Sequence, residues 1–334
     1  MKKLTAFILT VAVMLTCFAG CTKKMTVQSL YIGGEYVPVE TLMTIDGAEL
    51  TLFEYRYYFA KAKASIDGGD DSYWVTNEDA RQELLETTLE LVRYEFAKEK
   101  LYGDLGFKIT RDMWKSIDAY IKAYRSSMTD DQWAEILEMS YLDEALFRRM
   151  NAKNAYDPEL SDYYFGVGGQ IKLKLADILE YMQEEYYHYK YVCIRKDYDG
   201  TTVNLDLIND IQERAAKGED FDALMKAYSR DYATNATKNG NYSPVDGENS
   251  VIIAVLAALE EGAVSDVVEF EGSYYVYKKL PIVEKDAQTD YDVFKAQYIS
   301  DYIDDVINEI IEQQDIDIVS EYYEDISVET LLWK

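Results

Sequence analysis

The sequence predicts an α+β fold in which the N- and C-terminal segments form a helical domain that carries an inserted module of mixed helix and strand. Three observations lead to this prediction. Apolar residues recur at helical spacing from Thr51 to about Tyr187. They alternate in the manner of a strand over Tyr189–Arg195, and helical spacing returns after Pro281. Because domain insertion succeeds at exposed loops, this order of segments indicates an inserted module.

Length, composition and charge narrow the possible classes of protein. A chain of 334 residues is long enough for about two domains, and a hydrophobic content of 48% allows each to have a core. Lys and Arg total 34 against 62 Asp and Glu, which gives a formal net charge of −28. Such a charge argues against nucleic-acid binding, which requires basic patches that neutralise phosphates. It favours cationic partners.

The first residues have the pattern of an export signal. Lys2 and Lys3 are followed by the apolar stretch Leu4–Leu15, which is too short to be an ordinary membrane span. The stretch ends in Phe-Ala-Gly before Cys21, which resembles the signal of bacterial lipoproteins. The resemblance implies a signal peptide over residues 1–20, a lipid on Cys21 and a tether over 21–40. The protein would then be extracytoplasmic and lipid-anchored to the bacterial cell membrane. The alternative is an ordinary cleaved signal with a chance cysteine.

Cysteine usage gives no disulfide framework. The chain contains 3 cysteines. Cys17 would be removed with the signal and Cys21 would be acylated, so Cys193 has no partner for an intramolecular disulfide. We expect Cys193 to be a buried apolar residue.

Capping residues mark the starts of the helices before Tyr187. Thr51 with Glu54 three residues later predicts a helix to about Ile66. The later helices are predicted to start at Thr76 with Asp79, at Thr110, at Thr129 with Gln132 (a helix that includes Leu146), at Asp157-Pro158 as N-cap and N1, and at about Ile171. A short strand and turn, Thr41–Gly47, precede them.

The segment from Tyr189 to Leu280 predicts a compact α+β module. After the first strand come a helix that ends near Gly218, a helix over Phe221–Tyr228, a turn at Asn239–Tyr242, a helix over Val251–Leu259, and strands over Val267–Phe270 and Tyr274–Leu280. A stripe that begins at Phe294 predicts a final helix, and Ile316–Tyr323 predicts a closing strand or short helix.

Several segments of this module resemble the parvulin rotamase domain of PrsA- and SurA-type foldases. Gly218–Ser229 reads GEDFDALMKAYS, which is similar to the family pattern G-x-D-F-x-x-L-A-x-x-Y-S. Leu259–Ser265 reads LEEGAVS and Gly272–Lys278 reads GSYYVYK, similar to the family's L-x-x-G-x-V-S and its last strand. Ile45–Tyr55 resembles the opening of the SurA-like chaperone domain. The resemblance implies a helical chaperone domain over 41–187 plus 284–334 and a parvulin-like module over 188–283.

The resemblance also implies a site, from which this chain departs. Parvulins rotate the bond before proline, whose barrier is about 18–20 kcal/mol, without a cofactor, a metal or a covalent intermediate. They use a pair of histidines beside an apolar cup. The two histidine positions fall at Tyr191 and Tyr275, and Asp231 matches a family Asp. The cup falls near Asn249 and Ile252, with Leu256 close by. A tyrosine hydroxyl can donate and accept a hydrogen bond but does not titrate near neutrality.

The resemblance therefore predicts a membrane-anchored chaperone or foldase that binds unfolded exported polypeptides, with weak or lost isomerase activity. One alternative is an active peptidyl-prolyl isomerase in which Tyr191 and Tyr275 replace the histidines. Another is a surface lipoprotein that binds one defined partner. With 31 tyrosines in the chain, a tyrosine-lined cradle for clients is a further hypothesis. Its candidate clusters are Tyr55, Tyr57 and Tyr58, and Tyr186, Tyr187 and Tyr189.

Other chemistries find little support. One histidine, His188, and no cysteine pair predict no zinc site, and a hydrolytic triad would have to use His188. Asp67, Asp70 and Asp71 lack the spacing of a calcium-binding EF-hand loop, so we expect a solvated acidic loop.

Overall fold

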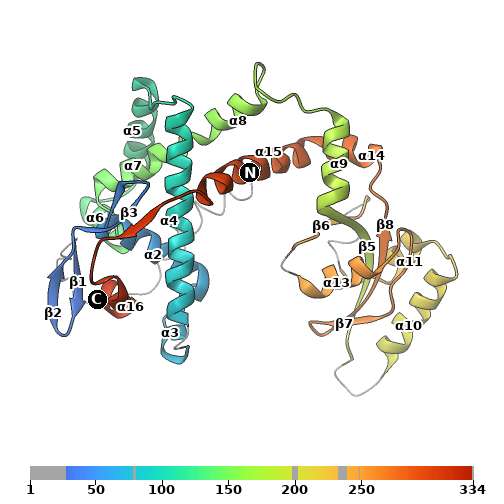
Figure 1. The fold of residues 1–334 in the computed structure, drawn as a ribbon. Coiled ribbons are helices and arrows are strands. Elements are labelled where there is room, and N and C mark those ends of the chain that lie inside the picture. Colours follow the sequence, from blue (N-terminus) through green and yellow to red (C-terminus); the bar gives the residue numbers. More distant parts are fainter. Residues whose placement is uncertain (1–27, 78–79, 198–201, 232–238, 248, 333–334) are drawn as a thin grey trace. The chain divides into compact units, whose positions relative to one another are not determined.

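The computed structural model describes residues 28–77, 80–197, 202–231, 239–247 and 249–332 (Figure 1). The predicted signal peptide, Cys21 and the first part of the tether lie outside these residues. Within them, no helix is both long and apolar enough to cross a membrane.

The fold combines helices with small antiparallel sheets, and the chain divides into two compact units. One unit contains the residues up to Gly168 and those from Tyr302 onward, and the other is Gly169–Asp301. The predicted module boundaries, 188 and 283, lie inside the second unit. Residues 169–187 and 284–301, which the sequence assigns to the helical domain, belong to the unit that contains the four-stranded sheet.

The first unit combines two small sheets with a set of helices. Its elements are β1 (Ser29–Ile32), β2 (Glu35–Pro38), β3 (Thr41–Ile45), β4 (Ala48–Thr51), α2 (Leu52–Asp67), α3 (Tyr73–Thr76), α4 (Ala80–Asp104), α5 (Arg111–Arg125), α6 (Asp130–Met139), α7 (Glu144–Asn154), α8 (Asp157–Phe165), β9 (Ile316–Ile318), the 3₁₀ helix Tyr323–Asp325 and α16 (Val328–Leu331). The helix α15 (Tyr291–Ile311) contributes residues to both units.

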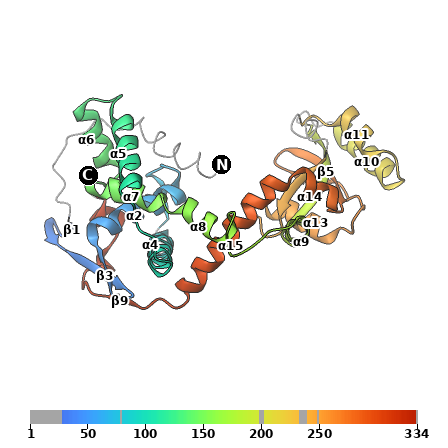
Figure 2. The same cartoon turned by 90° about the horizontal axis from the view of Figure 1, so that it is seen from above.

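Segments from both ends of the chain close the core of this unit. β9 pairs antiparallel with β3, with Met43 opposite Ile318, so the closing strand is confirmed (Figure 2). The core contains Leu42, Leu50 and Phe59 together with Leu331. The fully buried guanidinium of Arg56 donates to the carbonyl oxygens of Ser29 (2.7 Å) and Leu331 (3.0 Å). One side chain thus joins α2 to β1 and to the C-terminal helix.

Three of the predicted helix starts are confirmed with their caps. The hydroxyl oxygens of Thr51 and Thr110 each accept a hydrogen bond from the backbone N–H three residues later. Thr129 and Gln132 form a complete capping box. These side chains satisfy backbone N–H groups that have no partner within the helix.

Other predicted bounds are wrong. Thr76 ends the short α3, and the described part of the long α4 begins at Ala80. Asp79, the second residue of the predicted start, lies outside the described residues. The helix after Thr129 ends at Met139 because Tyr141 has a φ of 55°, outside the helical range, and Leu146 belongs to α7. Asp157 is not an N-cap.

Asp157 has another partner, and one more helix is shorter than predicted. The Asp157 carboxylate accepts a hydrogen bond from Tyr102 Oη at 2.6 Å and pairs with Lys98, which explains why it does not cap α8. The helix predicted from Ile171 to Tyr187 covers only Leu175–Glu185, and the strand begins at Tyr186.

The second unit is built on a four-stranded antiparallel sheet of order β6-β5-β8-β7 (Figure 1). Its elements are α9 (Leu175–Glu185), β5 (Tyr186–Arg195), α10 (Val203–Ala216), α11 (Phe221–Tyr228), β6 (Asn241–Pro244), α13 (Ser250–Ala258), β7 (Val268–Phe270), β8 (Ser273–Leu280) and α14 (Glu284–Thr289).

Helices cover both faces of this sheet. Val192, Ile194 and Val276 pack against α10 and α11, in a cluster that includes Ile208 and Leu224. Tyr189 and Tyr277 pack against Leu256 of α13. Because successive strand residues point to opposite faces, the alternation of β5 and β8 separates these two clusters.

Candidate functional site

The candidate site lies on the face of the sheet that α13 covers. β5 and β8, the first and last long strands of the predicted module, lie side by side as expected, with Tyr191 opposite Tyr277 and Cys193 opposite Tyr275. Residues at every second position share a face of the sheet. Tyr187, Tyr189, Tyr191, Tyr275 and Tyr277 therefore lie together, and we call this set the tyrosine face.

The rings of the tyrosine face form a contiguous cluster. The ring centroid of Tyr191 lies 5.9 Å from that of Tyr275 and 5.9 Å from that of Tyr277. Tyr275 and Tyr277 are stacked, with centroids 5.8 Å apart and an interplanar angle of 10°. Tyr189 and Tyr277 are buried, whereas Tyr191 and Tyr275 are only partly buried. The latter two rings are the accessible part of the cluster.

The structure brings together all five residues that the sequence predicts for the site. The Tyr191 hydroxyl donates a hydrogen bond to the carboxylate of Asp231. Ile252 and Leu256 of α13 pack in the same cluster as Tyr191 and Tyr275. The apolar side of the predicted site is thus supplied by α13, and its one carboxylate by the segment after α11. The roles of these residues stay predictions.

Burial raises the pKa of two hydroxyl groups of the tyrosine face and of the neighbouring Cys193 thiol. Loss of solvent and contact with the Cys193 thiol raise the pKa of Tyr275 to about 12. Burial also raises the pKa of Tyr277 and that of the Cys193 thiol. These groups are therefore neutral at physiological pH, and the hydroxyls act as hydrogen-bond donors. Cys193 is buried, as predicted, and its backbone N–H donates to Ser229 Oγ at 3.2 Å.

The only histidine of the chain is not part of the tyrosine face. His188 is buried, with Nδ1 3.1 Å from the carbonyl oxygen of Pro281 and Nε2 2.5 Å from that of Asn239. Its ring stacks on Tyr242 with centroids 4.5 Å apart. His188 thus joins β5 to the turn before β6 and to the end of β8, which is a structural role. No imidazole supplies acid–base chemistry beside Tyr191.

Sequence reasoning missed Tyr277 and Lys279 as parts of this face. Lys279 Nζ lies 4.8 Å from the ring centroid of Tyr187 and donates to the carbonyl oxygens of Leu256 and Leu259, each at 2.9 Å. The spacing of two residues between Tyr275, Tyr277 and Lys279 is the signal that could have identified them.

Only some of the tyrosines in the two predicted clusters belong to the tyrosine face. Tyr55 and Tyr58 are 0% and 1% exposed in the core of the first unit, so they cannot contact a client. Tyr186 packs against Tyr181 and Phe294 in a separate cluster. Of the predicted tyrosine clusters, Tyr187 and Tyr189 belong to the tyrosine face.

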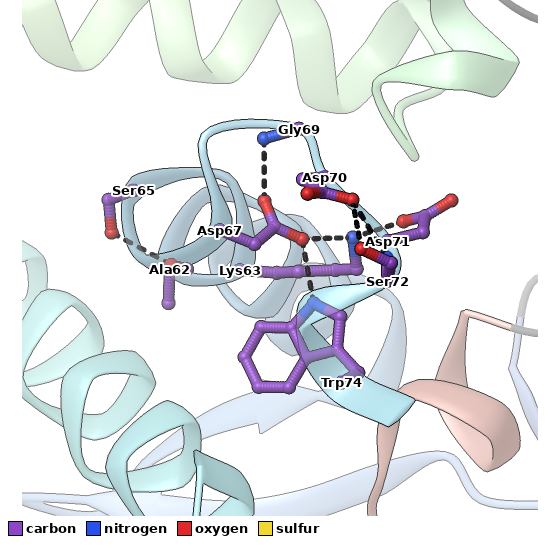
Figure 3. Close-up of polar contacts among 9 residues, drawn as sticks. All are labelled: Ala62, Lys63, Ser65, Asp67, Gly69, Asp70, Asp71, Ser72 and Trp74. Carbon is purple, nitrogen blue, oxygen red and sulfur yellow. Dashed lines mark hydrogen bonds and ion pairs between the residues drawn. The ribbon is translucent and has the colours of Figure 1, made fainter. Parts of the chain in front are cut away.

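The acidic loop after α2 holds an internal cation. The Lys63 ammonium lies 2.6 Å from carboxylate oxygens of both Asp67 and Asp71 (Figure 3). Asp67 also accepts hydrogen bonds from Trp74 Nε1 at 2.7 Å and from the backbone N–H of Gly69 at 2.8 Å. In the part of the chain that the structure describes, no group of His, Cys, Asp or Glu side chains could hold a metal ion.

Among known proteins, the chain is similar to several solved structures. No family model and no curated protein sequence match the chain. A crystal structure of PrsA from Bacillus subtilis is similar over 73% of this chain and 85% of its own, with 18% identity and a TM-score of 0.28. The foldase protein PrsA from Streptococcus pneumoniae is similar over 82% of this chain and 93% of its own, with 14% identity and a TM-score of 0.32.

A third similar structure comes from Campylobacter jejuni and is described as a SurA-like chaperone. It covers 84% of this chain and 99% of its own, with 11% identity and a TM-score of 0.31. These solved proteins are thus PrsA foldases and SurA-like chaperones, the same types of protein that the sequence resembles.

Proposed function

We propose that this chain is an extracytoplasmic chaperone or foldase that is anchored to the membrane through a lipid on Cys21. It binds unfolded or partly folded exported polypeptides, and its isomerase activity is weak or lost. The observation that carries the proposal is the tyrosine face, where Tyr191, Asp231 and Tyr275 meet the apolar α13 and no imidazole is present.

The face suits binding of a polypeptide better than catalysis. Tyrosines supply a rigid apolar surface with a hydroxyl at its edge, which is the usual property of contact residues. Burial raises the pKa of Tyr275 and Tyr277, so both hydroxyls stay protonated near neutrality, where they can donate hydrogen bonds but do not serve as general bases. A client segment could be held by ring contacts and hydrogen bonds. The neutral imidazole pair that parvulin-like chemistry uses has no counterpart here.

Two assays on the chain without residues 1–21 test the proposal. Light scattering should show that the chain suppresses aggregation of several unrelated unfolded proteins, and that Tyr191→Ala with Tyr275→Ala weakens this effect. Tyr120→Ala is the matched control, because Tyr120 is an exposed tyrosine on α5. No protection by the unsubstituted chain would overturn the proposal.

Magnetisation-exchange NMR on an Ala-Pro peptide tests the second half of the proposal. We expect no increase in the cis–trans exchange rate at high concentrations of the chain. A clear increase that Tyr191→Ala abolishes would instead support an active isomerase. Saturable binding to a single partner without general protection would support a lipoprotein with one defined ligand.

A further inference from the structure

We propose that the accessible part of the tyrosine face, formed by Tyr191, Tyr275 and Asp231, binds a basic side chain, arginine or lysine, from an extended client segment. This inference rests on the proposed function and names the ligand class of the same site. The juxtaposition of aromatic rings with one carboxylate carries it.

The two accessible rings are close enough to act on one cation. The ring centroids of Tyr191 and Tyr275 lie 5.9 Å apart, and both rings pack on the buried ring of Tyr277. The face of an aromatic ring is electrostatically negative and attracts a cation within about 6 Å of its centroid. Asp231, which accepts a hydrogen bond from Tyr191, adds a formal negative charge beside these rings. An ammonium or guanidinium group gains from both interactions, whereas a neutral side chain gains from neither.

The same face already holds a cation of this chain. The Lys279 ammonium lies 4.8 Å from the ring centroid of Tyr187, and it also donates to two backbone carbonyl oxygens at the end of α13. This arrangement occupies one end of the tyrosine face. The chemistry of a lysine on a tyrosine ring is therefore present in the structure, and Tyr191 and Tyr275 offer the same chemistry next to a carboxylate.

The surrounding sequence is complementary to a basic ligand. From Asn239 to Tyr277 the chain contains no Lys, Arg or His, and it contains seven carboxylates: Asp246, Glu248, Glu260, Glu261, Asp266, Glu269 and Glu271. Among these, Glu269 pairs with Lys196. This stretch supplies α13, β7 and most of β8, the elements next to the face. The two central strands also carry Lys190, Arg195, Lys278 and Lys279, of which Lys190 pairs with Asp222. The carboxylates of the stretch from Asn239 to Tyr277 favour a basic segment over an acidic one.

Peptide titrations on the chain without residues 1–21 test the inference. The probes are a capped Ala-Ala-Arg-Ala-Ala peptide, the same peptide with citrulline in place of arginine, and the same peptide with glutamate. Citrulline is nearly isosteric with arginine but carries no charge, and its urea has a carbonyl acceptor and fewer N–H donors than the guanidinium. By calorimetry or NMR line shifts we expect the arginine peptide to bind roughly three- to tenfold more tightly than the citrulline peptide. Equal affinities would overturn the inference.

Three variants separate a site from general attraction to an acidic protein. Tyr275→Leu removes a ring without changing the net charge, and it should weaken arginine binding by roughly three- to tenfold. Asp231→Asn is isosteric and should weaken it by a similar factor. Tyr120→Leu is the control in the other unit and should have no effect. If all variants bind arginine equally, the attraction is not at this site.

The failure of this inference can be told apart from the failure of the proposed function. If the unsubstituted chain suppresses aggregation but shows no preference for arginine over citrulline, the chaperone proposal stands and the ligand class is wrong. If it does not suppress aggregation of any client, the proposed function is wrong whatever the peptides show.

Discussion

Gly240 lies so close to His188 that no side chain fits between them. A Cβ atom added to Gly240 would be 2.8 Å from Nε2 of His188 and 2.8 Å from the carbonyl oxygen of Tyr189. The φ angle of Gly240 is +102°, a value that residues with a side chain rarely adopt. The turn before β6 therefore requires glycine for two independent reasons, and the buried imidazole depends on it.

Replacing Gly240 by alanine should destabilise the second unit strongly. Backbone strain and the clash with His188 together should cost about 2–5 kcal/mol. The measurement is urea unfolding of the intact chain followed by circular dichroism, with hydrogen exchange to assign the loss to β5 and β6. Gly262→Ala is a matched control, since Gly262 has a φ of +82° but no atom within 4 Å of an added Cβ. It should cost only the strain, about 1–3 kcal/mol. Equal losses in the two variants would contradict the role of the His188 contact.

The loop that contains Asp67 should depend on that carboxylate and much less on Asp70. Asp67→Asn removes the charge that faces Lys63 and weakens the bond from Trp74, so the first unit should lose about 1.5–3 kcal/mol. The Asp70 side chain is exposed, and in the contacts described for it the carboxylate accepts hydrogen bonds only from Ser72, so Asp70→Asn should change stability far less. Thermal unfolding monitored by tryptophan fluorescence distinguishes the two. Equal shifts in melting temperature would refute the internal ion pair as the cause.

The sequence predicts the acidic residues of this loop but not their contacts with Lys63, which comes from the preceding helix. The acidic residues and the absence of an EF-hand pattern were visible, but Lys63 lies on the preceding helix and its position depends on how α2 ends. Arg56 is a similar case. Nothing in its sequence neighbourhood indicates a fully buried guanidinium, because its acceptors, the carbonyls of Ser29 and Leu331, come from opposite ends of the chain. Long-range polar contacts leave no periodic signal.

Local signals were more informative, although the helix starts predicted at Thr76 and Asp157 were wrong. Thr51, Thr110 and Thr129 cap helices through bonds within three residues, and the alternation of β5 and β8 fixes which side chains share a face. Tyr191 and Tyr275 lie close together because β5 pairs with β8 and both side chains lie on the same face of the sheet. On α2, Phe53 and Tyr57 are less buried than Tyr55 and Phe59. Both the sheet β3–β4 and α4 contact this helix, so periodicity alone cannot rank its faces.

The stability of the chain at alkaline pH should depend on the hydroxyl of Tyr275. Its pKa in the folded chain is raised to about 12 from the ordinary 10, mainly by burial. A raised pKa contributes stability that is complete below pH 10 and is lost as the pH rises toward 12. The unsubstituted chain should therefore lose about 1 kcal/mol more than Tyr275→Phe between these values, once the partial exposure of the ring is allowed for. Urea unfolding at a series of pH values measures the difference. Parallel curves for the two chains would contradict the raised pKa.

Histidines placed at the two tyrosine positions should restore isomerase chemistry if the rest of the site is suitable. Tyr191 and Tyr275 lie on one face of adjacent strands, with their ring centroids 5.9 Å apart, beside Asp231 and the apolar Ile252 and Leu256. Two imidazoles there could form the hydrogen-bonded pair of neutral groups that tyrosines cannot supply.

The measurement is magnetisation-exchange NMR on an Ala-Pro peptide. Tyr191→His with Tyr275→His should raise the exchange rate above that of the unsubstituted chain, and each single substitution should raise it much less. A double variant with Tyr189→His and Tyr277→His controls for the mere presence of imidazoles, because those two positions are buried under α13 and unreachable by a peptide. A folded but inactive Tyr191/Tyr275 double variant would show that histidines at these two positions are not sufficient for isomerase activity. The defect would then lie in the apolar cup, where Ile252 and Leu256 would fail to hold a proline ring.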